Sequence, residues 1–258
     1  MKKRFHSRIS PFDYDQAAVI LREVGDQMLG RLDVVTLQPK CIVEVGCATG
    51  YCASLLSNRY PGAQVIAMDE SATMIDYAKA QCDAPIDWVC APLEPLPLAD
   101  HSVDLLVSNV TVAWCNDIET TMTEWRRVLR PGGLLMMSGL GVDTLRECPP
   151  AALLAFSRMD MHDVGDILMR SGFADPVMDV DYFELHYKNQ EKLASELSVM
   201  GLMRDEHIVL SPDEKGRYSL SIEVFYAHAW GGPEKQFTTE DGLTSIPLAH
   251  LRRQLRGE

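Results

Sequence analysis

A short glycine-containing loop is the part of the chain whose residue types point most directly to chemistry. Glu44-Val45-Gly46-Cys47-Ala48-Thr49-Gly50 follows an apolar run and precedes a helical pattern. Glycines at such a junction permit a tight turn and let a ligand approach the backbone amides. The spacing differs by one residue from the G-x-G-x-x-G fingerprint of dinucleotide-binding folds. Because any α/β fold can contain a glycine-rich turn, the loop by itself does not identify a ligand.

A carboxylate follows the next apolar run. Asp69 comes directly after Gln64-Val65-Ile66-Ala67-Met68, 23 residues after Gly46. An acid at the tip of the second strand lies beside such a loop and can accept hydrogen bonds from both hydroxyls of a ribose. The alternative is that Asp69 only caps the helix that starts near Ser71. Together, the loop and the acid predict a nucleoside-like ligand.

The elements that must position these residues alternate along the middle of the chain. Helical patterns fill the gaps between short apolar runs, which are nearly continuously apolar, as strands buried on both faces should be. This alternation predicts a parallel sheet covered by helices on both sides. The sequence predicts strands at 41–45, 64–68, 86–90, 103–108 and 134–138, a helix ending near Arg59, helices at 71–81 and 117–129, and a turn at 130–133.

The two flanks complete the predicted architecture. Residues 10–32 are predicted as one amphipathic helix that starts at the Ser10-Pro11 cap. Beyond residue 140, the pattern predicts helices at 160–171 and 189–200 and strands at 177–187 and 218–230. The expected fold is therefore α/β, a doubly wound and mostly parallel seven-stranded sheet with an N-terminal helix and antiparallel final strands. One domain, 1–258, ends in a tail, 231–258.

Composition narrows the class of protein. The net charge of −13 argues against nucleic-acid binding, and no run of about 18 apolar residues predicts a membrane span. The seven cysteines include no Cys-x-x-Cys pair, so we expect free thiols in a reducing compartment, the cytoplasm, and no metal site. The basic residues Lys2, Lys3, Arg4 and Arg8 form either a solvated tail or a patch for an acidic partner.

Further segments make the ligand more specific. Leu93-Glu94-Pro95-Leu96-Pro97-Leu98, Ser102–Asn109 and Arg127–Gly133 follow the loop and Asp69 in order. Together these segments resemble the class I S-adenosylmethionine (SAM) methyltransferases, which have a Rossmann-like fold. The resemblance implies that the core, 40–140, binds SAM and its product S-adenosylhomocysteine. The residues expected to bind the cofactor are Glu44, Gly46, Cys47, Ala48, Gly50, Asp69, Glu70, Met74, Leu93, Asn109 and Trp114.

A narrower resemblance lies outside the cofactor loop. Tyr14–Ala18, Val112–Asp117, Met161–Asp166 and Tyr226–Gly231 are similar to the malonyl-acyl-carrier-protein O-methyltransferase family of biotin synthesis. This similarity implies methyl transfer from SAM to the free carboxylate of a malonyl thioester on acyl-carrier protein, with no metal. It also implies that residues 1–35 form a helical lid and 141–230 the substrate side.

Three departures from the family pattern leave alternatives open. Ala48 replaces a glycine, Pro92 replaces an acid that pairs with adenine, and 148–158 is short and lacks the family's D-x-R-P-H-x-N-R-F. Arg158 is the candidate substitute for one missing arginine. We therefore expect SAM binding to be retained better than malonyl turnover. The alternatives are a degenerate, non-catalytic binding module, or a relative that modifies another carboxylate or a protein arginine.

The expected reaction needs positioning rather than a base. A carboxylate with a pKa near 4 is already ionised at neutral pH. The site must hold it in line and exclude water, and an arginine or tyrosine can hold it. The candidates are Tyr14, Arg127 and Arg146. Tyr14 could instead be a core tyrosine, and Arg127 could simply stabilise the end of its helix.

Overall fold

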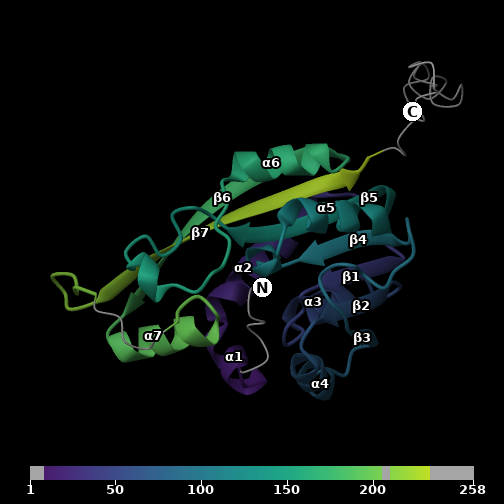
Figure 1. Cartoon of the computed structure of the whole chain (residues 1–258). Coiled ribbons are helices and arrows are strands. Elements are labelled where there is room, and N and C mark those ends of the chain that lie inside the picture. The colour runs from purple at the N-terminus through teal and green to yellow at the C-terminus, as the bar shows by residue number, and fades with distance from the viewer. Residues whose placement is uncertain (1–8, 205–209, 233–258) are drawn as a thin grey trace, which may run out of the picture.

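One seven-stranded sheet organises the part of the chain that the structure describes. The structure is a computed structural model that describes residues 9–204 and 210–232, so the basic N-terminal residues and most of the predicted tail lie outside it. Within the described residues the strand order is β3-β2-β1-β4-β5-β7-β6 (Figure 1). The strands are β1 Cys41–Val45, β2 Gln64–Asp69, β3 Ile86–Cys90, β4 Val103–Ser108, β5 Leu129–Leu140, β6 Phe173–Tyr187 and β7 Tyr218–Gly231.

The helices connect these strands. They are α1 Pro11–Ala17, α2 Val19–Gly30, α3 Tyr51–Arg59, α4 Ala72–Gln81, α5 Ile118–Val128, α6 Met161–Arg170 and α7 Gln190–Val199, with short 3-10 turns at Arg31–Val34, Thr111–Trp114 and Pro150–Ala152. No helix among the described residues is long and apolar enough to cross a membrane.

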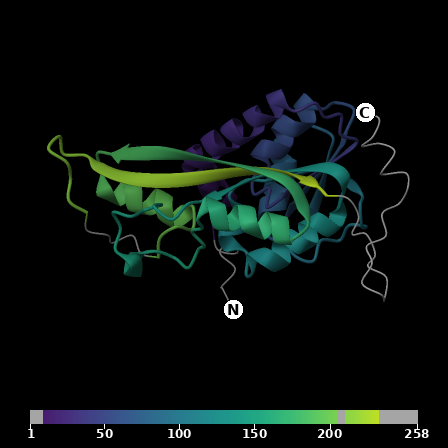
Figure 2. The same ribbon diagram turned by 90° about the horizontal axis from the view of Figure 1, so that it is seen from above.

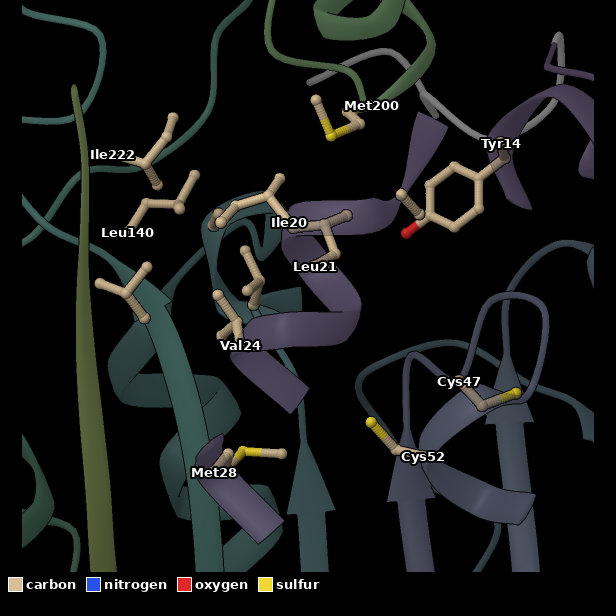
Figure 3. Close-up of a cluster of buried hydrophobic side chains, with 14 of the residues drawn as sticks. Tyr14, Ile20, Leu21, Val24, Met28, Cys47, Cys52, Leu140, Met200 and Ile222 are labelled. Atoms are coloured by element: carbon tan, nitrogen blue, oxygen red, sulfur yellow. The ribbon is translucent and has the colours of Figure 1, made fainter. Parts of the chain in front are cut away.

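Pairing in the sheet confirms the predicted fold class. Strands β1 to β5 pair in parallel, whereas β7 pairs antiparallel with both β5 and β6. Alternate residues of the central strands enter two separate cores, as the period of two of a strand requires. Ile42 and Leu105 pack with α2 and α3, and Val43 and Leu106 pack with α5 and α6. On the first face, Ile20, Val24 and Met28 of α2 belong to the same buried cluster as Leu140 of β5, and Ile20 lies nearest to the end of β5 (Figure 3).

The last two strands extend beyond the rest of the sheet. Residues 224–230 of β7 pair with β5, but 218–223 pair only with β6. Figures 1 and 2 show this hairpin reaching past the parallel strands, with α7 packed beneath it. Leu193 and Leu197 of α7 and Leu220 of β7 belong to the same buried cluster as α1 and α2. The overhang therefore places α7 close to the N-terminal helices.

Two predicted elements differ in detail. The single helix predicted at 10–32 is broken at Ala18. At the break, the Arg22 side chain donates to the Asp15 carbonyl at 2.8 Å, an oxygen that a continuous helix would pair with the Val19 amide. The predicted turn at 130–133 lies inside β5 as an irregularity, where the pairing with β4 shifts register between Val103 and Leu105.

Candidate active site

The glycine loop is held in shape by side chains behind it. Gly46 has φ +76°, and a Cβ there would lie 2.1 Å from Oγ1 of Thr111. Gly50 has φ +83°, and a Cβ would lie 2.5 Å from the ring of Trp88. Both positions therefore require glycine, since the left-handed conformation and the close neighbours each exclude a side chain. The loop connects the carboxyl end of β1 to α3.

Two buried carboxylates lie next to this loop. Asp69 is 3% exposed, and its two oxygens accept the backbone amides of Ala48 and Ser71, each at 2.9 Å. Glu44 is 2% exposed, and its Oε2 has no hydrogen-bond partner among the described residues. Burial, with a smaller contribution from the charge of Asp69, raises the pKa of Glu44 to about 8, although the Ala53 amide opposes the shift. An uncompensated carboxylate of this kind suits a cationic ligand.

A large cavity opens beside the loop. Its volume of about 1520 Å³ exceeds the roughly 300–1,000 Å³ of an ordinary small-molecule site, so it has room for two ligands. Nine of the residues expected to bind the cofactor line it, as does Tyr14: Glu44, Gly46, Cys47, Ala48, Asp69, Glu70, Leu93, Asn109 and Trp114. Tyr14 and Leu21 stand on one side of this space, and Cys47 and Cys52 on the other (Figure 3).

Four predicted site residues do not line this cavity. Gly50 lies behind the loop against Trp88, and Met74 is fully buried in the core. Arg127 binds Glu124 at 2.7 Å, Asp100 at 2.6 Å and the Leu98 carbonyl at 2.9 Å, so it fastens the loop before β4 to α5. Arg146 is exposed and faces Asp143 and Glu147.

The N-terminal helices are tied to the loop. Oγ1 of Thr49 donates to Asp15 at 2.9 Å, and Asp15 forms an ion pair with Arg22 at 2.5 Å. The Asn109 amide donates to the Leu21 carbonyl at 2.7 Å. Burial, and then the negative charge of nearby Asp69, raises the pKa of Tyr14. Its phenol therefore stays protonated at neutral pH and acts as a hydrogen-bond donor rather than as a base.

Sequence reasoning missed several lining residues. Thr49 lies in the quoted glycine loop, and Pro92 was noted only as a departure from the family pattern. Neither of them nor Arg22 was predicted as a site residue, and Ser198 and Arg204 come from α7 and the segment after it. No local pattern points to the last two, because only the overhanging hairpin brings that segment to the cavity. Pro92 lines the wall after β3 without a side-chain acceptor.

Ala48 gives a first prediction. Its φ of +46° is left-handed, which costs a residue with a side chain roughly 1–2 kcal/mol. We expect Ala48→Gly to raise the free energy of unfolding by about 0.5–1 kcal/mol, because the relieved strain exceeds the added chain entropy. Denaturant titration measures this free energy of unfolding. Ala99→Gly is the control, because Ala99 has no positive φ, and we expect this substitution to destabilise the protein. If the Ala48→Gly protein were less stable than the wild type, Ala48 would not be strained by its left-handed backbone conformation.

Fold and site together define a class of enzyme. A glycine loop after β1, an acid at the end of β2 and a cavity at the carboxyl ends of parallel strands, within a seven-stranded sheet of this order, are the arrangement of a class I SAM-dependent methyltransferase. A methyltransferase domain family matches residues 43–137.

Curated relatives specify the family. The chain is 38% identical to the malonyl-[acyl-carrier protein] O-methyltransferase of Methylovorus sp., over 90% of this chain and 89% of that protein. The malonyl-[acyl-carrier protein] O-methyltransferase 1 of Coxiella burnetii is 32% identical, over 98% of this chain and 95% of that protein. The chain belongs to the malonyl-[acyl-carrier protein] O-methyltransferase family, and its methyl donor is SAM.

Solved structures agree on the fold. The YcgJ protein of Bacillus subtilis superposes with a TM-score of 0.62 at 14% identity, covering 80% of this chain and 99% of that one. The phosphoethanolamine N-methyltransferase 2 of Haemonchus contortus, solved with S-adenosylhomocysteine, has a TM-score of 0.58 at 16% identity and covers 86% of this chain and 57% of that one. At these identities the likeness shows the fold alone.

Proposed function

We propose that this protein methylates the free carboxylate of malonyl-acyl-carrier protein, in the cytoplasm and without a metal, as a step of biotin synthesis. The observation that carries the proposal is the buried, unpartnered Glu44 Oε2 beside the glycine loop, in a cavity with room for a second ligand. The names of the relatives support the choice of acceptor.

The cofactor side of the cavity fits SAM group by group. Glu44 would face the ammonium group of the ligand, since a buried carboxylate is stabilised by a nearby cation. Asp69 would accept the ribose hydroxyls through lone pairs that Ala48 and Ser71 leave free. Pro92 and Leu93 would pack on the adenine through apolar contact alone.

The part of the cavity that binds the methyl acceptor needs only to orient the carboxylate and to exclude water from it. When bound, SAM supplies an activated methyl group on a sulfonium, and a carboxylate oxygen can take that methyl without losing a proton. Tyr14, neutral and buried at the wall, would donate a hydrogen bond to the carboxylate. The lid proposed for residues 1–35 would include helices α1 and α2, which the bonds from Thr49 and Asn109 hold over the cavity. These helices would exclude water from the site.

Asp69 provides a test of the cofactor side. We expect Asp69→Asn to weaken SAM binding about tenfold, because a charge-assisted hydrogen bond to the ribose becomes a neutral one. Both Asp69 oxygens accept backbone amides, so the amide nitrogen of asparagine would face one of these N–H donors. The thermal midpoint should therefore fall by more than in an Asp213→Asn control at an exposed turn, and the affinities are compared well below that midpoint. Calorimetry measures the affinity for SAM. An unchanged affinity would show that Asp69 does not bind the ribose.

Intact-mass spectrometry tests the proposed reaction. We expect malonyl-acyl-carrier protein incubated with enzyme and SAM to gain the mass of one added methyl group, and acetyl-acyl-carrier protein, which has no free carboxylate, to gain none. A protein that binds SAM but leaves the malonyl carrier unchanged would contradict the proposed acceptor.

A further inference from the structure

Two arginines line the large cavity, and their charges are compensated differently. Arg22 is paired with Asp15 at 2.5 Å. Arg204 has no carboxylate oxygen within 4.0 Å among residues 9–204 and 210–232. Most other arginines of this part of the chain do have one, such as Arg31, Arg59 and Arg170. In a chain with 37 acidic and 24 basic side chains, an arginine that lines a cavity without an acidic partner is suited to bind an external anion.

Arg204 is fixed in place by its own backbone and by one side-chain nitrogen. Its amide donates to the Ala152 carbonyl at 2.8 Å, and its Nε donates to the Leu153 carbonyl at 2.9 Å. Leu153 and Met203 form an isolated antiparallel bridge beside these bonds. The described residues provide no hydrogen-bond partner for the two terminal nitrogens, Nη1 and Nη2. The guanidinium is therefore oriented, and its outer edge is available.

That outer edge matches the chemistry of an oxyanion. Two parallel N–H groups of a guanidinium bind a carboxylate or a phosphate in a bidentate manner. A carboxylate has about four lone-pair sites, so two such bonds leave a lone pair for attack on a methyl group. The carbonyls that hold Arg204 belong to the short segment 148–158, which lacks the arginines of the family pattern. Arg204 thus places a guanidinium on that wall from another part of the chain.

We infer that Arg204 holds the carboxylate of the acyl group and selects acyl chains that end in a carboxylate. This role deepens the proposed function and rests on it. Arg158, the substitute that the sequence suggested, lines a neighbouring cavity of about 510 Å³, where it donates to the Thr144 carbonyl at 3.0 Å. A phosphate of the carrier protein's prosthetic arm offers the same oxyanion chemistry, so the experiment must separate the two sources.

The experiment measures ligand binding to the enzyme–S-adenosylhomocysteine complex by calorimetry. The ligands are malonyl-pantetheine, acetyl-pantetheine and acetyl-phosphopantetheine, and the proteins are the wild type, Arg204→Gln and Arg204→Lys. We expect Arg204→Gln to weaken malonyl-pantetheine about 10- to 100-fold, since a charged contact is lost, and to leave acetyl-pantetheine unchanged. Arg204→Lys should restore part of the loss. Arg170→Gln, which removes an exposed ion pair with Glu119, is the matched control and should change neither ligand.

Three binding results would overturn the inference. Malonyl-pantetheine binding that Arg204→Gln leaves unchanged would show that another group holds the carboxylate. A loss confined to acetyl-phosphopantetheine would assign Arg204 to the phosphate. An equal loss for malonyl- and acetyl-pantetheine would show a structural role only. Turnover is measured separately, so a wild type that binds malonyl-pantetheine through Arg204 but forms no ester would contradict the proposed function and still support the carboxylate subsite.

Discussion

Gly46→Ala is expected to lower SAM affinity roughly 100-fold and to destabilise the protein by roughly 2–5 kcal/mol. The new Cβ would lie 2.1 Å from Oγ1 and 2.4 Å from Cγ2 of Thr111, in a left-handed backbone conformation. Thr111 cannot easily withdraw, because its hydroxyl lies 3.3 Å from the Val45 carbonyl and the residue is buried. The loop must therefore shift, and the cofactor wall shifts with it.

Calorimetry and denaturant titration measure these two effects. Gly30→Ala is the matched control, because a Cβ there meets nothing within 4 Å, and it should leave both quantities close to those of the wild type. Thr111→Ala in the Gly46→Ala background should restore part of the affinity, since it removes the two nearest atoms. If the Gly46→Ala protein bound SAM as tightly as the wild type, SAM would not bind at the glycine loop.

Glu44 gives the second large effect, and it depends on pH. With its pKa raised to about 8, Glu44 is mostly protonated at pH 7. An ammonium group bound beside it favours the ionised form, so its pKa falls on binding and a proton is released. S-Adenosylhomocysteine affinity should therefore rise from pH 6 to about pH 8 and level off above. Glu44→Gln should bind at least about tenfold more weakly at pH 8, because the charged partner is gone.

Calorimetry at pH 7 in buffers of different ionisation enthalpy counts the released protons. We expect net release of protons when S-adenosylhomocysteine binds the wild type and none when it binds Glu44→Gln. Methylthioadenosine, which lacks the amino-acid group, should release none from the wild type. Equal proton release by the wild type and Glu44→Gln would show that another group titrates.

The sequence predicted the sheet well because buried parallel strands leave a local signature. The runs at 41–45 and 103–108 are apolar almost throughout, and the buried strands β1 and β4 occupy those residues. The break at Ala18 was missed because the apolar residues keep their helical spacing through it, while the Asp15 carbonyl there accepts from the Arg22 side chain. The spacing of apolar residues does not predict which backbone carbonyl a long side chain will bind.

The two walls of the cavity differ in how far the sequence predicts their residues. The wall beside the glycine loop comes from local motifs, and Gly46, Ala48 and Asp69, which the sequence predicts to bind the cofactor, line the cavity there. The acceptor wall depends on how distant segments pack. Arg127 carries the charge that would bind a carboxylate ligand, but its guanidinium donates to Glu124, Asp100 and the Leu98 carbonyl. Arg204 reaches the cavity only because 202–204 pairs with 152–154.

Transfer of a radiolabelled methyl group from SAM to malonyl-acyl-carrier protein tests the central claim most directly, when it is followed by mild alkali. A methyl ester of a carboxylate is hydrolysed by alkali, whereas a methylated arginine is not. We expect label on the malonyl carrier protein that alkali releases as volatile methanol, and no label on the acetyl carrier protein. Label that resists alkali, or SAM binding without any transfer, would contradict carboxyl methylation by this site.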